Sequence, residues 1–131
     1  MFSHIMVGTN DPDRSKAFYD AVLATLDVPP GTVDKQPTKH RVFWRTKTGV
    51  FGVSTPIDGK EAHHANGGTI GFACSTPEQV HAFHEAGVKA GGTPIEEPPG
   101  LRPGPSGFYL AYLRDPDGNK ICAMHRVKAP A

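Results

Sequence analysis

Apolar residues recur along the chain with helical and strand periods in a fixed order. Residues 2–8 are mostly apolar and extended in character, and Asn10, Asp11 and Pro12 then supply a helix cap followed by a proline in the first turn. A three-and-four spacing of side chains predicts one buried face for this helix, made by Phe18, Ala21, Val22, Thr25 and Leu26. Residues 28–31, which read Val-Pro-Pro-Gly, end the helix.

The second half of the chain repeats this order. Residues 69–74 indicate a strand, residues 76–79 match a capping box, and Gly91 with Gly92 ends the following helix. The buried face of this helix is expected from Val80, Phe83 and Val88. Shorter extended runs follow each helix, at residues 40–46 and 49–54 in the first half and at residues 93–96, 108–114 and 120–124 in the second.

The two halves are related by a displacement of 65 residues. Five residues recur at this spacing, namely Ile5, Pro12, Ala17, Phe18 and Ala21, which return as Ile70, Pro77, Ala82, Phe83 and Ala86. Such a repeat predicts two copies of one unit that face each other around a shared space. We therefore expect a single α+β domain of two modules, about residues 1–62 and 63–131, with helices on one face of mixed sheets. The polar residues 56–68 would link the modules, and residues 97–107 would form a lid or rim loop.

The charge balance excludes several kinds of partner. Fourteen Lys and Arg against thirteen Asp and Glu leave a formal charge of +1 without a basic run, so we expect neither nucleic acid nor a membrane as partner. No charged leader or apolar segment of ~20 residues is present, so we expect a cytoplasmic protein. Two cysteines do not make a disulfide framework, and strand alternation places Cys74 and Cys122 on opposite faces of a sheet.

Three short motifs add to the internal repeat. His4 lies early in the first strand, residues 13–19 (Asp-Arg-Ser-Lys-Ala-Phe-Tyr) lie on the first helix, and residues 114–119 (Arg-Asp-Pro-Asp-Gly-Asn) precede the last strand. Over nearly its whole length the chain thus resembles the vicinal oxygen chelate superfamily, which includes glyoxalase I, bleomycin resistance proteins and extradiol dioxygenases. The resemblance implies two tandem βαβββ modules whose mixed sheets curl around an open cavity, helices on the outside, and a homodimer.

The resemblance also implies where metal ligands would lie. In the metal enzymes of the family they project from the first and last strands of each module, which here correspond to His4, a position within residues 50–54, Thr69 and Cys122. Only His4 is a ligand of the family's kind, whereas catalytic zinc and non-haem iron sites need three protein ligands. We therefore expect no catalytic metal, and a divalent Zn, Ni, Fe or Mn ion is the alternative.

Strand alternation gives the inner wall of the cavity if His4 points inward. Candidate catalytic residues are His4 and Cys122, because a nearby imidazole can lower the pKa of a thiol. The candidate ligand-binding residues are His4, Trp44, Thr69, Arg102, Tyr109, Tyr112 and Cys122. For these residues a structural interpretation also stands, in which aromatic rings fill a core, the thiol is a small buried group and the arginine lies on the surface.

These features favour a small-molecule-binding protein of the glyoxalase and bleomycin-resistance type, with a cavity between its modules and no catalytic metal. One alternative is a metal-dependent lyase or isomerase of the glyoxalase I (lactoylglutathione lyase) type, which needs a Lewis acid and a base. Another is a metal-free isomerase that uses His4 as its acid or base. The missing metal ligands count in favour of the binding protein.

Overall fold

The computed structural model describes residues 1–127 as ten secondary-structure elements. In chain order they are β1 (His4–Gly8), α1 (Pro12–Ala24), β2 (Thr32–Lys35), β3 (His40–Thr46), β4 (Gly49–Ser54), β5 (Ile70–Ala73), α2 (Pro77–Lys89), β6 (Thr93–Leu101), β7 (Phe108–Arg114) and β8 (Lys120–Arg126). Residues 128–131 lie outside the description, and with them the expected end of the second module at residue 131.

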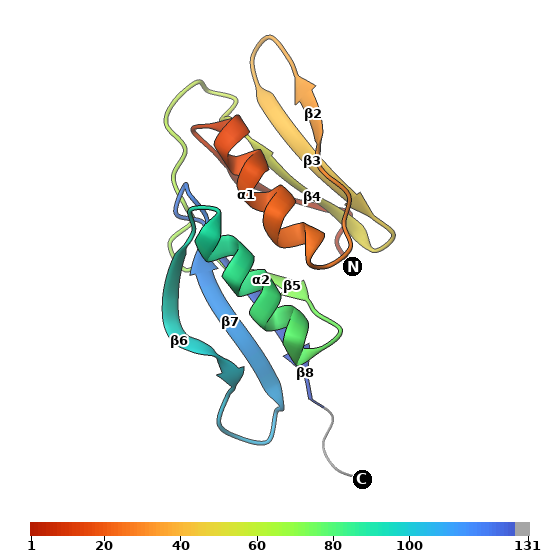
Figure 1. Ribbon diagram of the computed structural model, residues 1–131. Helices are drawn as coiled ribbons and strands as arrows, with labels where there is room; N and C mark the ends of the chain where they lie inside the picture. The colour runs from red at the N-terminus through yellow and green to blue at the C-terminus, as the bar shows by residue number, and fades with distance from the viewer. Residues whose placement is uncertain (128–131) are drawn as a thin grey trace.

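The elements form two modules with the same topology. One sheet has the strand order β1-β4-β3-β2 and the other the order β5-β8-β7-β6. In each sheet the first strand pairs in parallel with its neighbour, and the other pairs are antiparallel. Figure 1 shows both helices on the same side of the sheets, side by side and antiparallel. The predicted α+β class and the tandem modules are therefore confirmed.

The helices begin where the sequence predicts. α1 and α2 each have 13 residues, and their first residues, Pro12 and Pro77, are 65 positions apart. Asp11 caps α1 and Thr76 caps α2, each by accepting a hydrogen bond from the amide three residues further on, at 3.1 and 3.2 Å. Neither helix within residues 1–127 has the length and apolarity that crossing a membrane would need.

Two strands differ from the prediction. β2 carries mostly exposed polar side chains, so no alternating apolar signal marks it in the sequence. β6 continues into the loop expected at residues 97–107, of which only residues 102–107 remain. The register of β6 against β7 shifts between Ile95 and Gly100, and Glu96 has a left-handed backbone with φ 59°. A bulge thus accommodates the prolines that concealed this strand.

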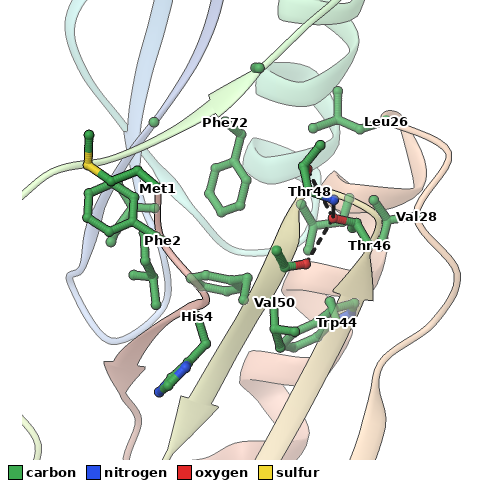
Figure 2. Close-up of a pocket in the computed structure, with 17 residues that line it drawn as sticks. Met1, Phe2, His4, Leu26, Val28, Trp44, Thr46, Thr48, Val50 and Phe72 are labelled. Atoms are coloured by element: carbon green, nitrogen blue, oxygen red, sulfur yellow. Dashed lines mark hydrogen bonds between the residues drawn. The ribbon is translucent and has the colours of Figure 1, made fainter.

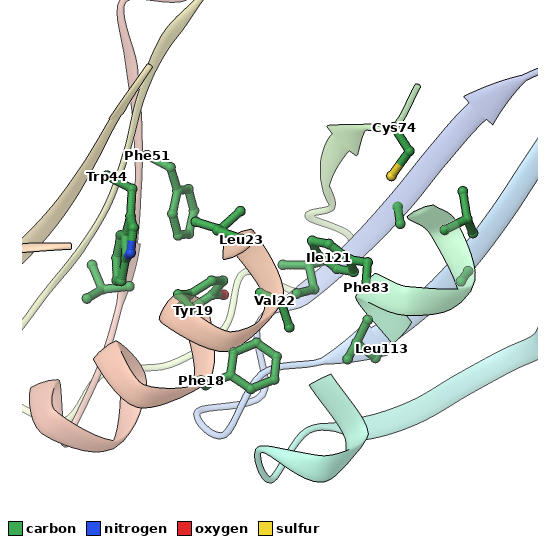
Figure 3. Packing of buried hydrophobic residues seen from close by; sticks show 14 of the residues in the cluster. Phe18, Tyr19, Val22, Leu23, Trp44, Phe51, Cys74, Phe83, Leu113 and Ile121 are labelled. Carbon is green, nitrogen blue, oxygen red and sulfur yellow. The ribbon is translucent and has the colours of Figure 1, made fainter. Parts of the chain in front are cut away.

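One hydrophobic core lies between the helices and the sheets (Figure 3). The buried positions of α1 are Ser15, Phe18, Tyr19, Val22 and Leu23. The buried face of α1 is therefore rotated from the predicted one. On α2, Val80 and Phe83 are buried as predicted, whereas Val88 is 41% exposed and Gly87 is buried instead.

Gly87 allows α1 and β7 to approach α2 closely. A Cβ atom at this position would overlap Leu113 Cδ1 of β7 and would lie 3.2 Å from Val22 Cγ1 of α1. A side chain larger than hydrogen would therefore disturb the packing of α2 on β7 within the second module and crowd Val22 of the first. The absence of a side chain at Gly87 thus lets α2 pack closely on both neighbours.

A chain of aromatic contacts crosses from one module to the other. In the first module Tyr19 packs against Trp44 and Phe51, with ring centroids 5.5 and 4.7 Å apart. Phe51 then meets Phe72 of the second module edge to face at 5.2 Å, and Phe72 meets Phe83 at 5.6 Å. An aromatic pair of this kind contributes about 0.5–1.5 kcal/mol beyond the burial of its area. The contact of Phe51 with Phe72 therefore stabilises the packing of one module on the other.

The Asp-Pro-Asp-Gly-Asn hairpin between β7 and β8 is tied to the first module. Asp115, which is 3% exposed, accepts a hydrogen bond from the Tyr19 hydroxyl at 2.6 Å. Asp117 accepts one from the Thr9 hydroxyl at 2.6 Å, and the Asn119 side chain donates to the carbonyl at the end of β1 at 2.9 Å. The hairpin motif therefore has a structural role: its hydrogen bonds join the two modules.

Burial disfavours ionisation of both partners in the central hydrogen bond. It raises the pKa of Tyr19 well above its usual value, and the neighbouring Asp115 charge adds to the effect. Burial also raises the pKa of Asp115, although hydrogen bonds from Tyr19 and Asn119 partly offset this rise. Because the folded-state pKa of Asp115 lies above its unfolded value, this carboxyl stabilises the fold most in acid. That contribution is lost as the pH rises through the folded-state pKa.

We expect Gly87→Ala to destabilise the protein by about 1–3 kcal/mol, because the added methyl group must displace Leu113 or separate the helices. Urea unfolding followed by the fluorescence of Trp44 measures this change. Gly100→Ala is the matched control: its methyl group would meet no atom within 4 Å, so a neutral or slightly stabilising effect is expected. Equal destabilisation by both variants would contradict close packing at Gly87.

Tyr19→Phe removes the hydroxyl that donates to Asp115. We expect a loss of about 1–3 kcal/mol at pH 7 and a smaller loss near pH 4, because lowering the pH favours the neutral form of the acceptor, whose pKa burial raises. Urea unfolding at both pH values measures the difference. Tyr109→Phe makes the same chemical change at an exposed hydrogen bond and should cost less than about 0.5 kcal/mol. An equal cost at the two positions would rule out the proposed role of Asp115.

Candidate functional site

A cleft opens between the modules where the inner edges of the two sheets face each other. β1 and β5 are edge strands, each hydrogen-bonded within its sheet on one side. In the described part of the chain no Cα atom of β1 comes within 8 Å of a Cα atom of β5, so the sheets do not join. The space beside these edges is a cavity of about 470 Å³ (Figure 2).

The lining of the cleft is mostly apolar. It comprises Met1, Phe2, His4, Ile5, Leu23, Leu26, Val28, Trp44, Thr46, Thr48, Gly49, Val50, Phe51, Ile70, Gly71, Phe72 and Ala73. These residues, drawn from the described range 1–127, include no Asp, Glu, Lys or Arg side chain. The volume lies within the range of about 300–1,000 Å³ that is typical of small-molecule sites.

Elements of both modules build the walls of the cleft. The turn after α1 contributes Leu26, and β5 contributes Phe72, whose ring points into the space in Figure 2. Phe51 and Phe72 meet edge to face at the floor. Gly71 and Ala73 also line the cleft and add little bulk. The cleft therefore exists only where both modules are folded and packed together.

The hairpin between β3 and β4 supplies polar groups at the mouth. Thr46 Oγ1 donates to the Gly49 carbonyl at 2.9 Å and lies 3.2 Å from Thr48 Oγ1. Within residues 1–127 this is the single hydrogen-bond contact of Thr48 Oγ1, so the hydroxyl retains capacity for another. Phe2, which is 66% exposed, lies at the opposite side of the mouth.

His4 lies at the rim of the cleft. Its Nδ1 is 2.7 Å from the hydroxyl oxygen of Ser3, and the side chain is exposed. Figure 2 shows its ring directed away from Leu26 and Val28. His4 is in register with Val50 on the sheet face opposite the helices. The imidazole can therefore hydrogen-bond to water or to the outer part of a ligand.

Trp44 is buried in the core on the helix side of its sheet; the sheet face opposite the helices is called the open face. It is 1% exposed, and its Nε1 donates to Asp20 Oδ1 at 2.9 Å. Burial by itself raises the pKa of Asp20, but hydrogen bonds from Lys16, Gly31 and Trp44 hold that pKa below its ordinary value. Trp44 reaches the cleft from the core side, and the neighbouring Phe43 takes the open face.

The two tyrosines of β7 face opposite ways. Tyr109 points toward α2, where its hydroxyl lies 2.6 Å from His81 Nε2, and it is not among the residues that line the cleft. Tyr112 faces the open side in register with Cys122. The ammonium group of Lys120 lies 4.8 Å from the Tyr112 ring centroid. Only Tyr112 of this pair can meet a ligand on the open face.

Cys122 is buried on the open face of the second sheet. It is 7% exposed, and a Cβ atom added to Gly71 would lie 3.2 Å from its Sγ. Burial raises the pKa of Cys122, while Lys120 lowers it and Glu96 raises it. No Cα atom of β1, which carries His4, comes within 8 Å of one of β8 in the described chain. These observations favour the interpretation of Cys122 as a small buried side chain over that of a thiolate nucleophile.

Sequence reasoning missed an ion pair beside this thiol. Lys120 pairs with Glu96, which the bulge in β6 presents in a left-handed backbone conformation. Nothing in the sequence marks that conformation, because left-handed backbone is uncommon outside glycine. Thr69 is exposed one residue before β5, on the same module. A shared role of Thr69, Cys122 and His4 stays a prediction.

Arg102 braces the end of β6. Its guanidinium donates to the carbonyl oxygens of Glu97, Pro98 and Gly100 at 3.1, 2.8 and 3.3 Å. Most of its directed donors are thus engaged by backbone. The expected clamp for a ligand carboxylate or phosphate is replaced by a support for the bulged strand.

The described residues do not fit the metal site that the resemblance implies. Within residues 1–127 no group of three or more His, Cys, Asp or Glu comes together that could hold a metal ion. The corresponding positions offer the imidazole of His4, the hydroxyl of Thr69 and the buried thiol of Cys122. One copy of the chain therefore lacks the three-ligand centre that metal catalysis in this fold would need.

Comparison with known proteins identifies a family and several similar solved structures. The family model described as Glyoxalase/Bleomycin resistance protein/Dioxygenase superfamily matches residues 1–123. The crystal structure of a glyoxalase/bleomycin resistance protein from Albidiferax ferrireducens T118 is 57% identical with a TM-score of 0.87, over 97% of this chain and 99% of that one. Glyoxalase I from Zea mays shares the fold alone, at 19% identity and a TM-score of 0.69, over 95% of this chain and 45% of that one. No curated protein matches the chain.

Cys122 is expected to react slowly with thiol reagents in the folded protein. In a Cys74→Ala variant, which leaves Cys122 as the single cysteine, alkylation by iodoacetamide at pH 7 should be about tenfold or more slower than in urea. The reason is that burial excludes the reagent and raises the pKa of the thiol. Mass spectrometry over time measures both rates. Alkylation of the folded protein at the unfolded rate would restore Cys122 as a candidate nucleophile.

Proposed function

Because the chain belongs to the glyoxalase/bleomycin resistance protein/dioxygenase superfamily, we propose that it is a small-molecule-binding protein whose ligand occupies the cleft between its modules. The observation that carries this proposal is the cavity of about 470 Å³ with walls from both modules. A pre-formed, mostly apolar cavity with a few polar groups is the usual form of a ligand site. His4 and the threonines of the β3–β4 hairpin supply those polar groups.

The proposal includes a homodimer in the cytoplasm. Apolar side chains that are only partly buried on the sheet faces opposite the helices include Met6 and Phe43 on one sheet and Met124 on the other. Within residues 1–127 no helix covers these faces. A second copy of the chain would shield them from water, which is the pairing that the family resemblance implies.

Two alternatives find less support. A metal-dependent lyase of the glyoxalase I type would need a three-ligand centre, which residues 1–127 of one copy do not offer. A metal-free isomerase would need an acid and a base that both reach the substrate. Among the described lining residues, His4 is the side chain that could act as an acid or a base. Its hydrogen-bond partner is the neutral hydroxyl of Ser3.

A thermal-shift screen of small molecules tests the proposal. A ligand present at one hundred times its Kd should stabilise the fold by about 2.7 kcal/mol, because it binds the folded state alone. Ala73→Phe fills the cleft from an exposed lining position and should abolish that stabilisation. Ala82→Phe makes the same change on an exposed position of α2 outside the lining and should preserve it.

Stabilisation that survives Ala73→Phe would place the ligand elsewhere. Elemental analysis of protein purified without a histidine tag addresses the metal alternative. Zn, Ni, Fe or Mn at one equivalent per chain would overturn the ranking and favour the metal-dependent lyase. A substoichiometric metal content is the expected result.

A further inference from the structure

We infer that the cleft selects uncharged ligands with a flat aromatic body and discriminates against anions. This inference rests on the proposed function and adds the chemical class of the ligand. Three properties of the lining carry it, namely the lack of counter-charges along the walls, the aromatic floor, and the hydroxyl groups at one side of the mouth.

The walls offer no counter-charge to a ligand. Among the described residues no Asp, Glu, Lys or Arg side chain lines the cleft, and Lys47 at the tip of the β3–β4 hairpin is exposed outside the lining. His4 is exposed at the rim with its ring directed away from Leu26. Met1 also lines the cleft but is fully exposed, so it does not enclose a ligand. An anion placed against such walls loses its hydration without gaining a partner, which disfavours carboxylates, phosphates and sulfonates.

The floor of the cleft favours contact with a ring. Phe51 and Phe72 cross with an interplanar angle of 77° and centroids 5.2 Å apart. Phe72 is only partly buried, so some of its ring surface is open to the cleft. Gly71 and Ala73, its neighbours along β5, carry little bulk at the same lining. A planar group can therefore lie beside Phe72 and gain both burial and an aromatic contact.

The hydroxyl groups at the mouth suit a neutral polar substituent. Thr48 Oγ1 keeps hydrogen-bonding capacity beyond its contact with Thr46. A hydroxyl can donate to a carbonyl and accept from an amine or alcohol, so it serves an uncharged group without needing a counter-ion. The ligand class that fits is an aromatic molecule with one neutral polar group, held with its rings at Phe72 and its polar end at the hairpin.

Two fluorescent probes with the same ring system test this inference. N-phenyl-1-naphthylamine is neutral, and 1-anilinonaphthalene-8-sulfonate adds one sulfonate to the same rings. Trp44, the one tryptophan of the chain, borders the cleft, and its emission should be quenched when a probe binds there. We expect the Kd of the neutral probe to be at least about tenfold lower than that of the sulfonate, because the sulfonate must be desolvated without a partner.

Lysine substitutions locate the site and reverse its preference. Leu26→Lys places an ammonium group in the cleft, and Ala73→Lys does so from an exposed position that no packed side chain depends on. Each variant should raise the Kd of the neutral probe about tenfold and lower the Kd of the sulfonate. Val33→Lys makes a comparable change at an apolar position that is 47% exposed and outside the lining, and it should change neither Kd.

The outcomes separate the inference from the proposed function. Equal or tighter binding of the sulfonate to the unaltered protein, if sensitive to Ala73→Lys, overturns the inference and leaves ligand binding in the cleft supported. Failure of both probes to quench Trp44 overturns both. Preferred binding of the neutral probe that neither cleft variant weakens also overturns both, because the probe then sits elsewhere.

Discussion

The buried carboxyl group of Asp115 joins the second module to the middle of α1 in the first module. It accepts a hydrogen bond from the Tyr19 hydroxyl inside the core, while Asp117 accepts one from Thr9, just before the helix begins. Removing a donor from such a group leaves it buried and under-satisfied, which is costly. The modules are thus joined from the N-terminus of α1 to its middle, and the cleft opens near the C-terminal end of the helix, where Leu23 lies.

Between these two ends, packing on the helix side decides how far apart the sheet edges lie. Gly87 allows the close approach of α1 to α2, and the contact of Phe51 with Phe72 bridges the modules beside the edges of β1 and β5. These contacts hold the strands too far apart to hydrogen-bond to each other. A cavity therefore takes the place of a continuous sheet, and its shape depends on core residues as much as on its own lining.

The sequence predicts the architecture of this protein better than its cleft. The repeat, the helix caps and the hairpin motif are local or periodic signals, and strand alternation correctly separates Cys74 from Cys122. Alternation fails where two aromatic residues are adjacent, as with Trp44 beside Phe43, because one of the two must face the core and the pattern does not say which. Leu26 and Phe72 approach each other only through packing between modules, for which no short-range signal exists.

Each module holds buried polar groups whose hydrogen-bond partners belong to the other module. Tyr19 belongs to the first module, whereas its acceptor Asp115 belongs to the second, together with Asn119, which reaches back to β1. A half-folded chain would leave these groups unpaired and would expose the facing rings of Phe51 and Phe72 to water. We therefore expect the whole chain to fold as one cooperative unit, so that circular dichroism and the emission of Trp44, a reporter in one module, should follow the same transition.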